Sequence, residues 1–399
     1  MDNDVRELLR DIAEDIPPQR QVPSTLRPRA RRRVVATVGM TLVFAVAVLV
    51  GGVAVLRSIT QASLVPVNPP AVRLPDDPGA WQRIVLPGGA PGCNDHGCLV
   101  RTVTAGDAGL VAMGTKFGCC GEAFAGWSSP DGLSWQQIDG DNPPKAAGFA
   151  AAGPGFVITG TNGVYTSTDG VSWDHVQPPV DRAEFLGVTA GGPGVVAVGS
   201  PDNAWFSSDG ATWQPATVPQ TGVPADMTRV AAGPDRLVAM GSTRAGGPRS
   251  ELVIWASSDG MTWHDVAIDN AIMSPSCRIT GLAGSPAGFV ATGWCGPVGH
   301  EGDYLVWRSA DGVTWSRVGG ALEGQTHYFA VSAGPNGFIG TNSQGVWTSV
   351  DGASWTPVPT GSAFQGAEVL NVIAWGSRFV AVGDMKDGHN VVWISGPQH

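Results

Sequence analysis

Three arginines stand on segments that we expect to be the innermost strands of repeated sheets, and their side chains could bind a carboxylate. They are Arg101, Arg229 and Arg278. A planar guanidinium can donate two parallel hydrogen bonds to one carboxylate, which a lysine cannot do. The three residues lie at different distances from the neighbouring turn, so they need not face one point. The sequence therefore predicts ligand-binding arginines in a cationic channel.

Two carboxylates, Glu301 and Asp303, are close enough in the sequence to act as an acid–base pair, although a solvated loop is the commoner explanation of this spacing. The sequence contains no phosphate-binding loop, zinc signature or nucleophile elbow. We therefore predict no metal site and no cofactor.

All six cysteines fall in or beside predicted connections, which indicates disulfides in an extracytoplasmic domain. Cys277 begins one predicted strand and Cys295 ends the next, so an antiparallel hairpin brings them together. Cys98 has the same relation to Cys119 and Cys120, and two adjacent cysteines do not easily bond to each other. The expected pairs are Cys277–Cys295, Cys98 with Cys119 or Cys120, and Cys93 with the one left over.

The composition indicates which elements position these residues. The chain has 399 residues with 56 Gly and 31 Pro, and only 15% are charged, which excludes a helical bundle and a disordered chain. Many short strands fit this excess of turn-forming residues. The formal net charge of −10 argues against binding to nucleic acid, which requires a basic surface.

A seven-residue motif, Ser-x-Asp-Gly-x-(Ser/Thr)-Trp, occurs six times, and an aromatic residue stands two positions before each Ser. The Asp-Gly pair suits a tight hairpin turn, and the hydroxyl and carboxylate oxygens can accept hydrogen bonds from the backbone of that turn. The polar residues of the motif therefore have structural roles. The copies are Ser129–Trp135, Ser167–Trp173, Ser207–Trp213, Ser257–Trp263, Ser309–Trp315 and Ser349–Trp355.

A second repeat, roughly Ala-Gly-x-x-x-(apolar)-Val-Ala-x-Gly, precedes each motif and occurs seven times, the last at Ala374–Gly383. The chain ends soon after Trp393-Ile394-Ser395, the start of a seventh motif, and Asp77–Trp81 supplies the missing half. Four strands per unit and seven units predict an all-β, seven-bladed β-propeller over residues 77–399, closed by an N-terminal strand. Thirteen of the 15 Trp fall in this scheme, and only Trp294 and Trp375 lie outside it.

These motifs resemble those of the Asp-box (BNR-repeat) propellers, the architecture of sialidases and of non-enzymatic relatives. The resemblance covers about four-fifths of the chain. In the family pattern one residue usually separates Asp from Gly, whereas the two are adjacent in all six full copies here.

The resemblance implies an alternative function as an exo-α-sialidase-type glycoside hydrolase. Such enzymes share three carboxylate-binding arginines, a Tyr–Glu nucleophile pair and an acidic Asp. Tyr304 and Tyr328 could serve as the nucleophile, with His327 beside Tyr328 as a ligand-binding candidate and Glu301 or Asp303 as the carboxylate. The Arg-Ile-Pro segment that opens the sialidase pattern is absent, so we favour a role without catalysis.

The N-terminal part of the chain predicts a membrane anchor. Residues 34–56 contain no charge, and a helix of that length spans about 34 Å, enough for a bilayer. Five arginines precede it within residues 27–33 and only Arg57 follows directly, so residues 1–33 are expected in the cytoplasm. Residues 5–16 show the spacing of a short amphipathic helix, and residues 57–76 form a Pro-rich linker.

Together these features predict a single-pass protein of a bacterial surface whose propeller lies outside the membrane. We expect it to bind or scaffold a glycan, a cell-wall polymer or a protein through the face that carries the long connections, among them those at residues 117–124, 243–251 and 294–303. A sialidase-like hydrolase is the first alternative. The second is a sensor that couples the propeller to a cytoplasmic partner of residues 1–33.

Overall fold

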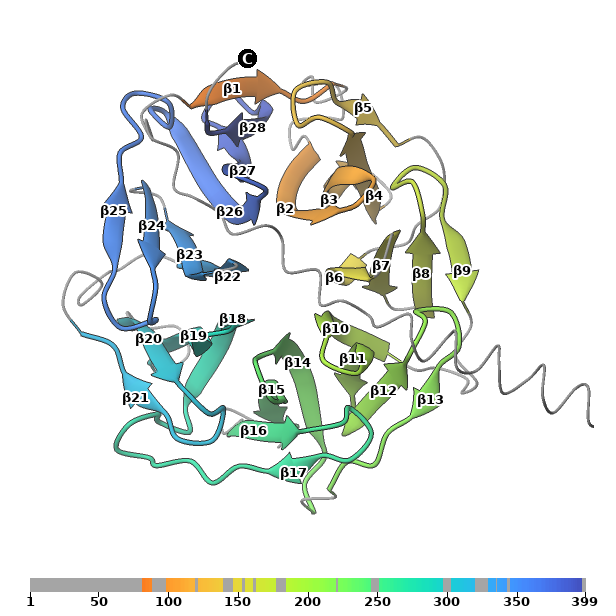
Figure 1. Ribbon diagram of the computed structural model, residues 1–399, viewed down its shortest axis with the longest axis vertical. Coiled ribbons are helices and arrows are strands. Elements are labelled where there is room, and N and C mark those ends of the chain that lie inside the picture. Colours follow the sequence, from red (N-terminus) through yellow and green to blue (C-terminus); the bar gives the residue numbers. More distant parts are fainter. Residues whose placement is uncertain are drawn as a thin grey trace, which may run out of the picture. The chain divides into compact units, whose positions relative to one another are not determined.

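The two sequence repeats fold into successive strands of four-stranded antiparallel sheets in the computed structural model (Figure 1). Seven such sheets surround a common centre, so the predicted all-β, seven-bladed propeller is confirmed. The structure describes residues 81–396 apart from 88–97, 119–120, 139–145, 153–154, 161–162, 177–183, 220–221, 245–250, 297–302, 320–328, 335 and 343–344. All described strands belong to one compact unit, Leu64–His399.

The blades are numbered here along the chain, and the strands of each blade run from the centre outward. Blade 1 comprises β2 (Cys98–Gly106), β3 (Gly109–Gly118), β4 (Gly121–Ser129) and β5 (Gln136–Gln137). Blade 2 comprises β6 (Ala146–Ala152), β7 (Gly155–Gly160), β8 (Gly163–Ser167) and β9 (Asp174–Val176). Blade 3 comprises β10 (Glu184–Gly191), β11 (Gly194–Ser200), β12 (Asn203–Ser207) and β13 (Gln214–Pro215).

Blade 4 comprises β14 (Ala225–Ala232), β15 (Leu237–Thr243), β16 (Leu252–Ser257) and β17 (His264–Asp265). Blade 5 comprises β18 (Cys277–Ser285), β19 (Gly288–Cys295), β20 (Asp303–Ser309) and β21 (Ser316–Arg317). Blade 6 comprises β22 (Ala330–Gly334), β23 (Gly337–Asn342), β24 (Gly345–Ser349) and β25 (Thr356–Val358). Blade 7 comprises β26 (Ala367–Trp375), β27 (Arg378–Met385), β28 (Asn390–Ile394) and the closing strand β1 (Gln82–Val85).

The closing strand confirms the predicted junction between the two ends of the propeller. β1 is the outermost strand of blade 7 and pairs with β28, with Arg83 opposite Trp393. Trp81 is buried, and its ring lies 5.0 Å from Phe364 and 6.4 Å from Phe379. The N-terminal strand therefore covers an edge that would otherwise expose unpaired backbone groups.

A β-bulge explains the glycine that ends the second repeat. In blade 4 the pairing of β14 with β15 shifts between Met227 and Arg229, so Thr228 is an extra residue opposite Gly241. A Cβ atom on Gly241 would overlap the carbonyl oxygen of Asp226, so only glycine fits against the bulge. Bulges at the same place interrupt the innermost strands of blades 1, 2, 3, 5 and 7.

The pairing also corrects one copy of this repeat. The sequence repeat ends at Gly340 in blade 6, but Gly340 pairs with Trp347, as Ala291 pairs with Trp307 in blade 5. Asn342 therefore stands where the other blades have their glycine.

The six Ser-x-Asp-Gly turns join the third and fourth strands of blades 1 to 6, and each packs against the preceding blade around the ring. In blade 5, Ser309 Oγ donates to Asp311 Oδ1 (3.0 Å), and the Gly312 N–H donates to Ser309 Oγ (2.8 Å). A Cβ atom on Gly312 would crowd Val238 of blade 4. These contacts support the structural role that the sequence predicts, and the buried core likewise lies between adjacent blades.

The connections differ from the sequence-based expectation at one place. We expected a long connection across residues 117–124, but β3 and β4 continue to Gly118 and Gly121, which face each other in the pairing. Pairing of the backbone groups satisfies them better than an open loop would. The longer connections expected at 243–251 and 294–303 agree with the strand bounds, which leave residues 244–251 between β15 and β16 and residues 296–302 between β19 and β20.

Within the described residues no helix is long and apolar enough to cross a bilayer. The predicted anchor at residues 34–56, the amphipathic helix at 5–16 and the linker at 57–76 all lie outside those residues, so they stay predictions.

Candidate functional site

One row of residues paired across the strands of a blade varies from blade to blade, on the face that carries the longer connections. On the second strand it lies one residue after the glycine that faces the bulge. We call this row the rim rung, and use rung for any such row of paired residues. Counted along the sequence of successive blades, this position holds Thr115, Thr161, Ser200, Ser242, Trp294, Ser343 and Asp384, of which Thr161 and Ser343 lie outside the described residues. The residue type thus varies between blades directly after the repeat ends, and such variation is expected of a binding surface on a rigid scaffold.

The rim rung of blade 5 places a cation beside two aromatic rings. Arg278 pairs with Trp294, and Trp294 pairs with Tyr304, so the three side chains lie in one row across β18, β19 and β20. Arg278 is exposed, and both aromatic residues are half-buried. Among the residues that the structure describes, none forms a hydrogen bond or ion pair with these three side chains.

A disulfide closes the same end of the blade 5 hairpin. It joins Cys277 and Cys295, whose Cα atoms lie 4.1 Å apart on the rung next to the rim rung. This is the pair that the hairpin geometry predicts. Because neighbouring rungs point to opposite faces of a sheet, the disulfide fixes the backbone of the rim rung without covering its side chains.

The rim rungs of blades 3 and 4 form a polar network that joins the two blades. Ser200 Oγ donates to Asp226 Oδ1 (2.6 Å), and the Arg244 guanidinium donates to both residues. Arg244 also lies 4.0 Å from the Glu184 carboxylate. Burial, together with the charges of Asp226 and Asp265, raises the pKa of the nearby Asp202 carboxyl. Arg244 is therefore engaged within the protein.

The rim rung of blade 7 holds two carboxyl groups beside Arg101. Glu368 pairs with Asp384, and Asp384 pairs with Asn390. Burial and the Glu368 charge raise the pKa of the Asp384 carboxyl, whereas the charge of Arg101 acts to lower it. The Val100 N–H donates to the buried Oδ1 of Asn390 (2.8 Å), which ties blade 7 to blade 1.

The three candidate arginines lie on innermost strands, but they do not form a common clamp. Arg278 lies on the rim rung, Arg101 is the bulge residue of blade 1, and Arg229 lies one residue beyond the bulge of blade 4. Arg229 donates to the carbonyl oxygens of Thr280 (3.2 Å) and Thr228 (2.8 Å). Of the three, Arg278 is therefore the cation best placed to meet a ligand.

The other predicted site residues are only partly described. Asp303 is exposed at the start of β20, opposite Cys295, so it lies on the rung beside Tyr304. Cys98 of β2 pairs with Lys116 of β3, and the structure describes only the backbone of Cys98. Outside the described residues lie Glu301, His327, Tyr328, Cys93, Cys119 and Cys120. The blade 1 disulfides and the sialidase-like residues therefore stay predictions.

The sequence shows that Trp294 lies outside the Trp repeat, but it did not lead us to a role for this residue. The sequence signal that could have identified it is its residue type, because every other blade has Thr, Ser or Asp at this position. Its alignment with Arg278 and Tyr304 required the strand pairing. No group of carboxylate, His or Cys side chains in the described ranges could hold a metal ion.

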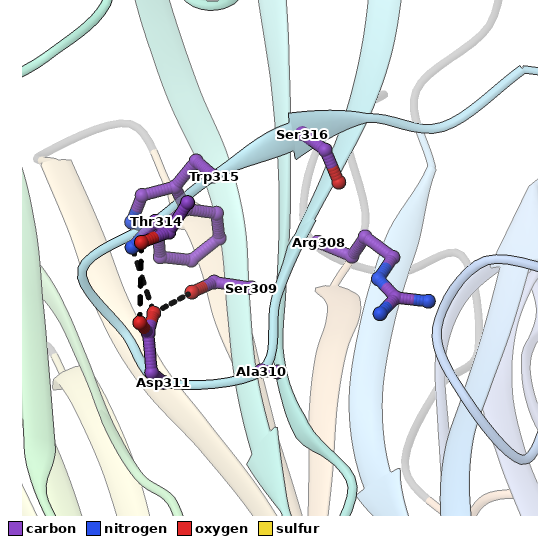
Figure 2. A pocket seen from close by; sticks show the side chains of 7 residues that line it. All are labelled: Arg308, Ser309, Ala310, Asp311, Thr314, Trp315 and Ser316. Atoms are coloured by element: carbon purple, nitrogen blue, oxygen red, sulfur yellow. Dashed lines mark hydrogen bonds between the residues drawn. The ribbon is translucent and has the colours of Figure 1, made fainter.

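A pocket of about 210 Å³ lies on the opposite face, around the Asp311 turn of blade 5 (Figure 2). Figure 2 shows the Asp311 carboxylate directed at Ser309 and Thr314, while Arg308 points away from it. Burial alone would raise the pKa of Asp311, but hydrogen bonds from the Thr314 and Val313 backbone and from the Ser309 and Thr314 hydroxyls lower it to about 2. The ionised Asp311 carboxylate therefore stabilises the turn by accepting these hydrogen bonds.

The comparisons with known proteins agree with this fold. The family described as the DUF6242 beta propeller domain matches residues 102–336. A catalytically inactive virginiamycin B lyase from Staphylococcus aureus has a TM-score of 0.51 at 11% identity, over 79% of this chain and 99% of the lyase. The Pan2 WD40 domain of Neurospora crassa has a TM-score of 0.53 at 13% identity, over 82% of this chain and 99% of that domain. Such low identities show the fold alone. No curated protein matches the sequence.

Proposed function

The chain belongs to the DUF6242 beta propeller domain family, and from this premise we propose that its propeller is a binding module that works without catalysis. Its ligand would be a glycan, a cell-wall polymer or a protein, held on the face that carries the rim rungs. The observation that carries this proposal is the row of Arg278, Trp294 and Tyr304, because these side chains are accessible and lack partners among the described residues. The Asp motifs, which resemble those of Asp-box propellers, would then serve the scaffold.

A glycoside hydrolase is the second candidate, and the rim rung of blade 7 supports it. Glycosidases need two carboxyl groups at a fixed separation, one of them often with a raised pKa. Glu368 and Asp384 are paired across two strands, so their Cβ atoms are about 5 Å apart. The pKa of Asp384 is raised by burial, as a general acid requires. Arg101 beside them reduces this effect, so we rank binding above hydrolysis.

The direct test is a binding screen with the 64–399 fragment against glycans, cell-wall polymers and intact bacterial cells. We expect saturable binding to one polymer class. Fluorogenic glycosides, including a sialoside, measured in parallel should release no more fluorophore than with a control protein. Hydrolysis that Asp384→Asn abolishes would replace the binding proposal by the hydrolase. Absence of binding to every probe would reject the proposal.

We propose further that residues 34–56 anchor the chain with the propeller outside the membrane and residues 1–33 in the cytoplasm. The uncharged run and the arginines before it support this orientation. Protease added to intact cells should remove the propeller and leave residues 1–33 protected. A propeller that resists protease until the cells are lysed would contradict the orientation. A cytoplasmic partner captured by residues 1–33 would support the sensor alternative.

A further inference from the structure

We propose that the rim rung of blade 5 is a subsite for a sugar ring that carries a carboxylate, as in a hexuronic acid unit. Trp294 and Tyr304 would contact the ring, and Arg278 would bind the carboxylate. This inference rests on the proposed binding function and names its ligand class.

The aromatic half of the subsite is not required by the fold. Trp294 stands where the other blades have Thr, Ser or Asp, so the propeller closes without an aromatic side chain there. Its ring is half-buried, and Tyr304 lies beside it on the next strand, with Cβ atoms about 5 Å apart. Two amphipathic rings side by side offer an apolar surface with polar edges, which suits the C–H face and hydroxyl groups of a pyranose.

Arg278, the cationic part of the subsite, would distinguish a sugar that carries a carboxylate from a neutral sugar. Arg278 lies directly across from Trp294 on the side away from Tyr304, and it is exposed. Two other described arginines are engaged within the protein: Arg229 donates to two carbonyl oxygens, and Arg244 to Asp226 and Ser200. A free guanidinium fork suits the flat, two-oxygen geometry of a carboxylate.

The spacing fits a single residue of a polymer. Paired residues on adjacent antiparallel strands have Cα atoms about 5 Å apart. A hexuronic acid carries its carboxylate directly on the ring, so one sugar residue can reach both Trp294 and Arg278. The chain after residue 33 has a net charge of about −12, so only a local cation can attract such an acid.

The disulfide restricts the backbone of this subsite even without a ligand. The Cys277–Cys295 bond fixes the open end of the hairpin one residue from both Arg278 and Trp294. A fixed backbone reduces the entropy that a ligand must remove on binding.

Calorimetric titration with oligogalacturonate, its methyl ester and a neutral galactose oligomer tests the inference on the 64–399 fragment. The wild type should bind the acid at least about tenfold more tightly than the ester. Arg278→Ala should weaken binding of the acid about tenfold and remove this preference. Trp294→Ala should weaken binding of the acid and the ester by a similar factor, whereas Trp294→Phe should retain most of the affinity.

One matched variant controls for general effects. Arg317→Ala removes an exposed arginine from the outermost strand of the same blade, and it should bind like the wild type. Equal affinity of the wild type for acid and ester, or unchanged binding by Trp294→Ala, would overturn the inference. A wild type that binds another polymer but none of these sugars would refute the subsite and leave the binding function standing.

Discussion

Removal of residues 77–89 from the 64–399 fragment is expected to abolish the cooperative unfolding of the whole propeller. The deletion removes β1, which pairs with β28, and the buried side chains of Trp81 and Leu86. Full burial of each such side chain is worth roughly 1.5–3 kcal/mol, and the deleted strand also leaves unpaired backbone groups on β28. Since every blade packs against two neighbours, loss of one junction opens the ring.

A deletion of equal length provides the control. Removing residues 64–76 takes away most of the Pro-rich linker, which contains none of the described strands, and should leave the melting transition unchanged. Thermal unfolding followed by circular dichroism, with light scattering for aggregation, distinguishes the two deletions. Addition of a 77–89 peptide should restore part of the lost transition. An unaltered cooperative melt without residues 77–89 would show that β1 does not close the ring.

The architecture could be predicted from the sequence because each blade repeats its local signals. The Asp-Gly turns fix the hairpins, and the mismatch between six motifs and seven second repeats identifies the split blade. Trp81 and Trp393, near opposite ends of the propeller sequence, each belong to one half of the split motif and so indicate the closing strand. The turn signals within a blade are local, and the repeat makes the same local signals recur along the chain.

The site could be predicted only in part, because it depends on pairing between strands. The sequence places Arg101, Arg229 and Arg278 on innermost strands, but one extra bulge residue changes the level and direction of each side chain. The Arg278–Trp294–Tyr304 row and the carbonyl partners of Arg229 follow from that register. Residues from distant parts of the chain meet there, and no periodic pattern records such contacts.

The bulge in β14 of blade 4 also predicts the effect of a substitution at the glycine that faces it. Gly241→Ala is expected to destabilise the propeller by about 3 kcal/mol, although alanine normally suits an extended backbone better than glycine. Gly241 does not have a positive φ angle, so conformational strain is not the reason. The added methyl group would overlap the Asp226 carbonyl oxygen, a backbone atom that cannot rotate away. The bulge must then flatten, which moves Asp226 away from Ser200 and Arg244.

Gly334→Ala is the matched control, because a Cβ atom there would meet its nearest neighbours at 3.7 and 3.8 Å, an ordinary contact distance. Gly334 ends the innermost strand of blade 6, so both substitutions add one methyl group within a strand of the ring. Urea unfolding should place Gly334→Ala within about 0.5 kcal/mol of the wild type. If Gly241→Ala proved equally stable, the bulge would not require glycine, and the repeated glycine would need another physical cause. A large loss of stability confined to Gly241→Ala would show that the close approach of the Asp226 carbonyl oxygen at the bulge leaves room for glycine only.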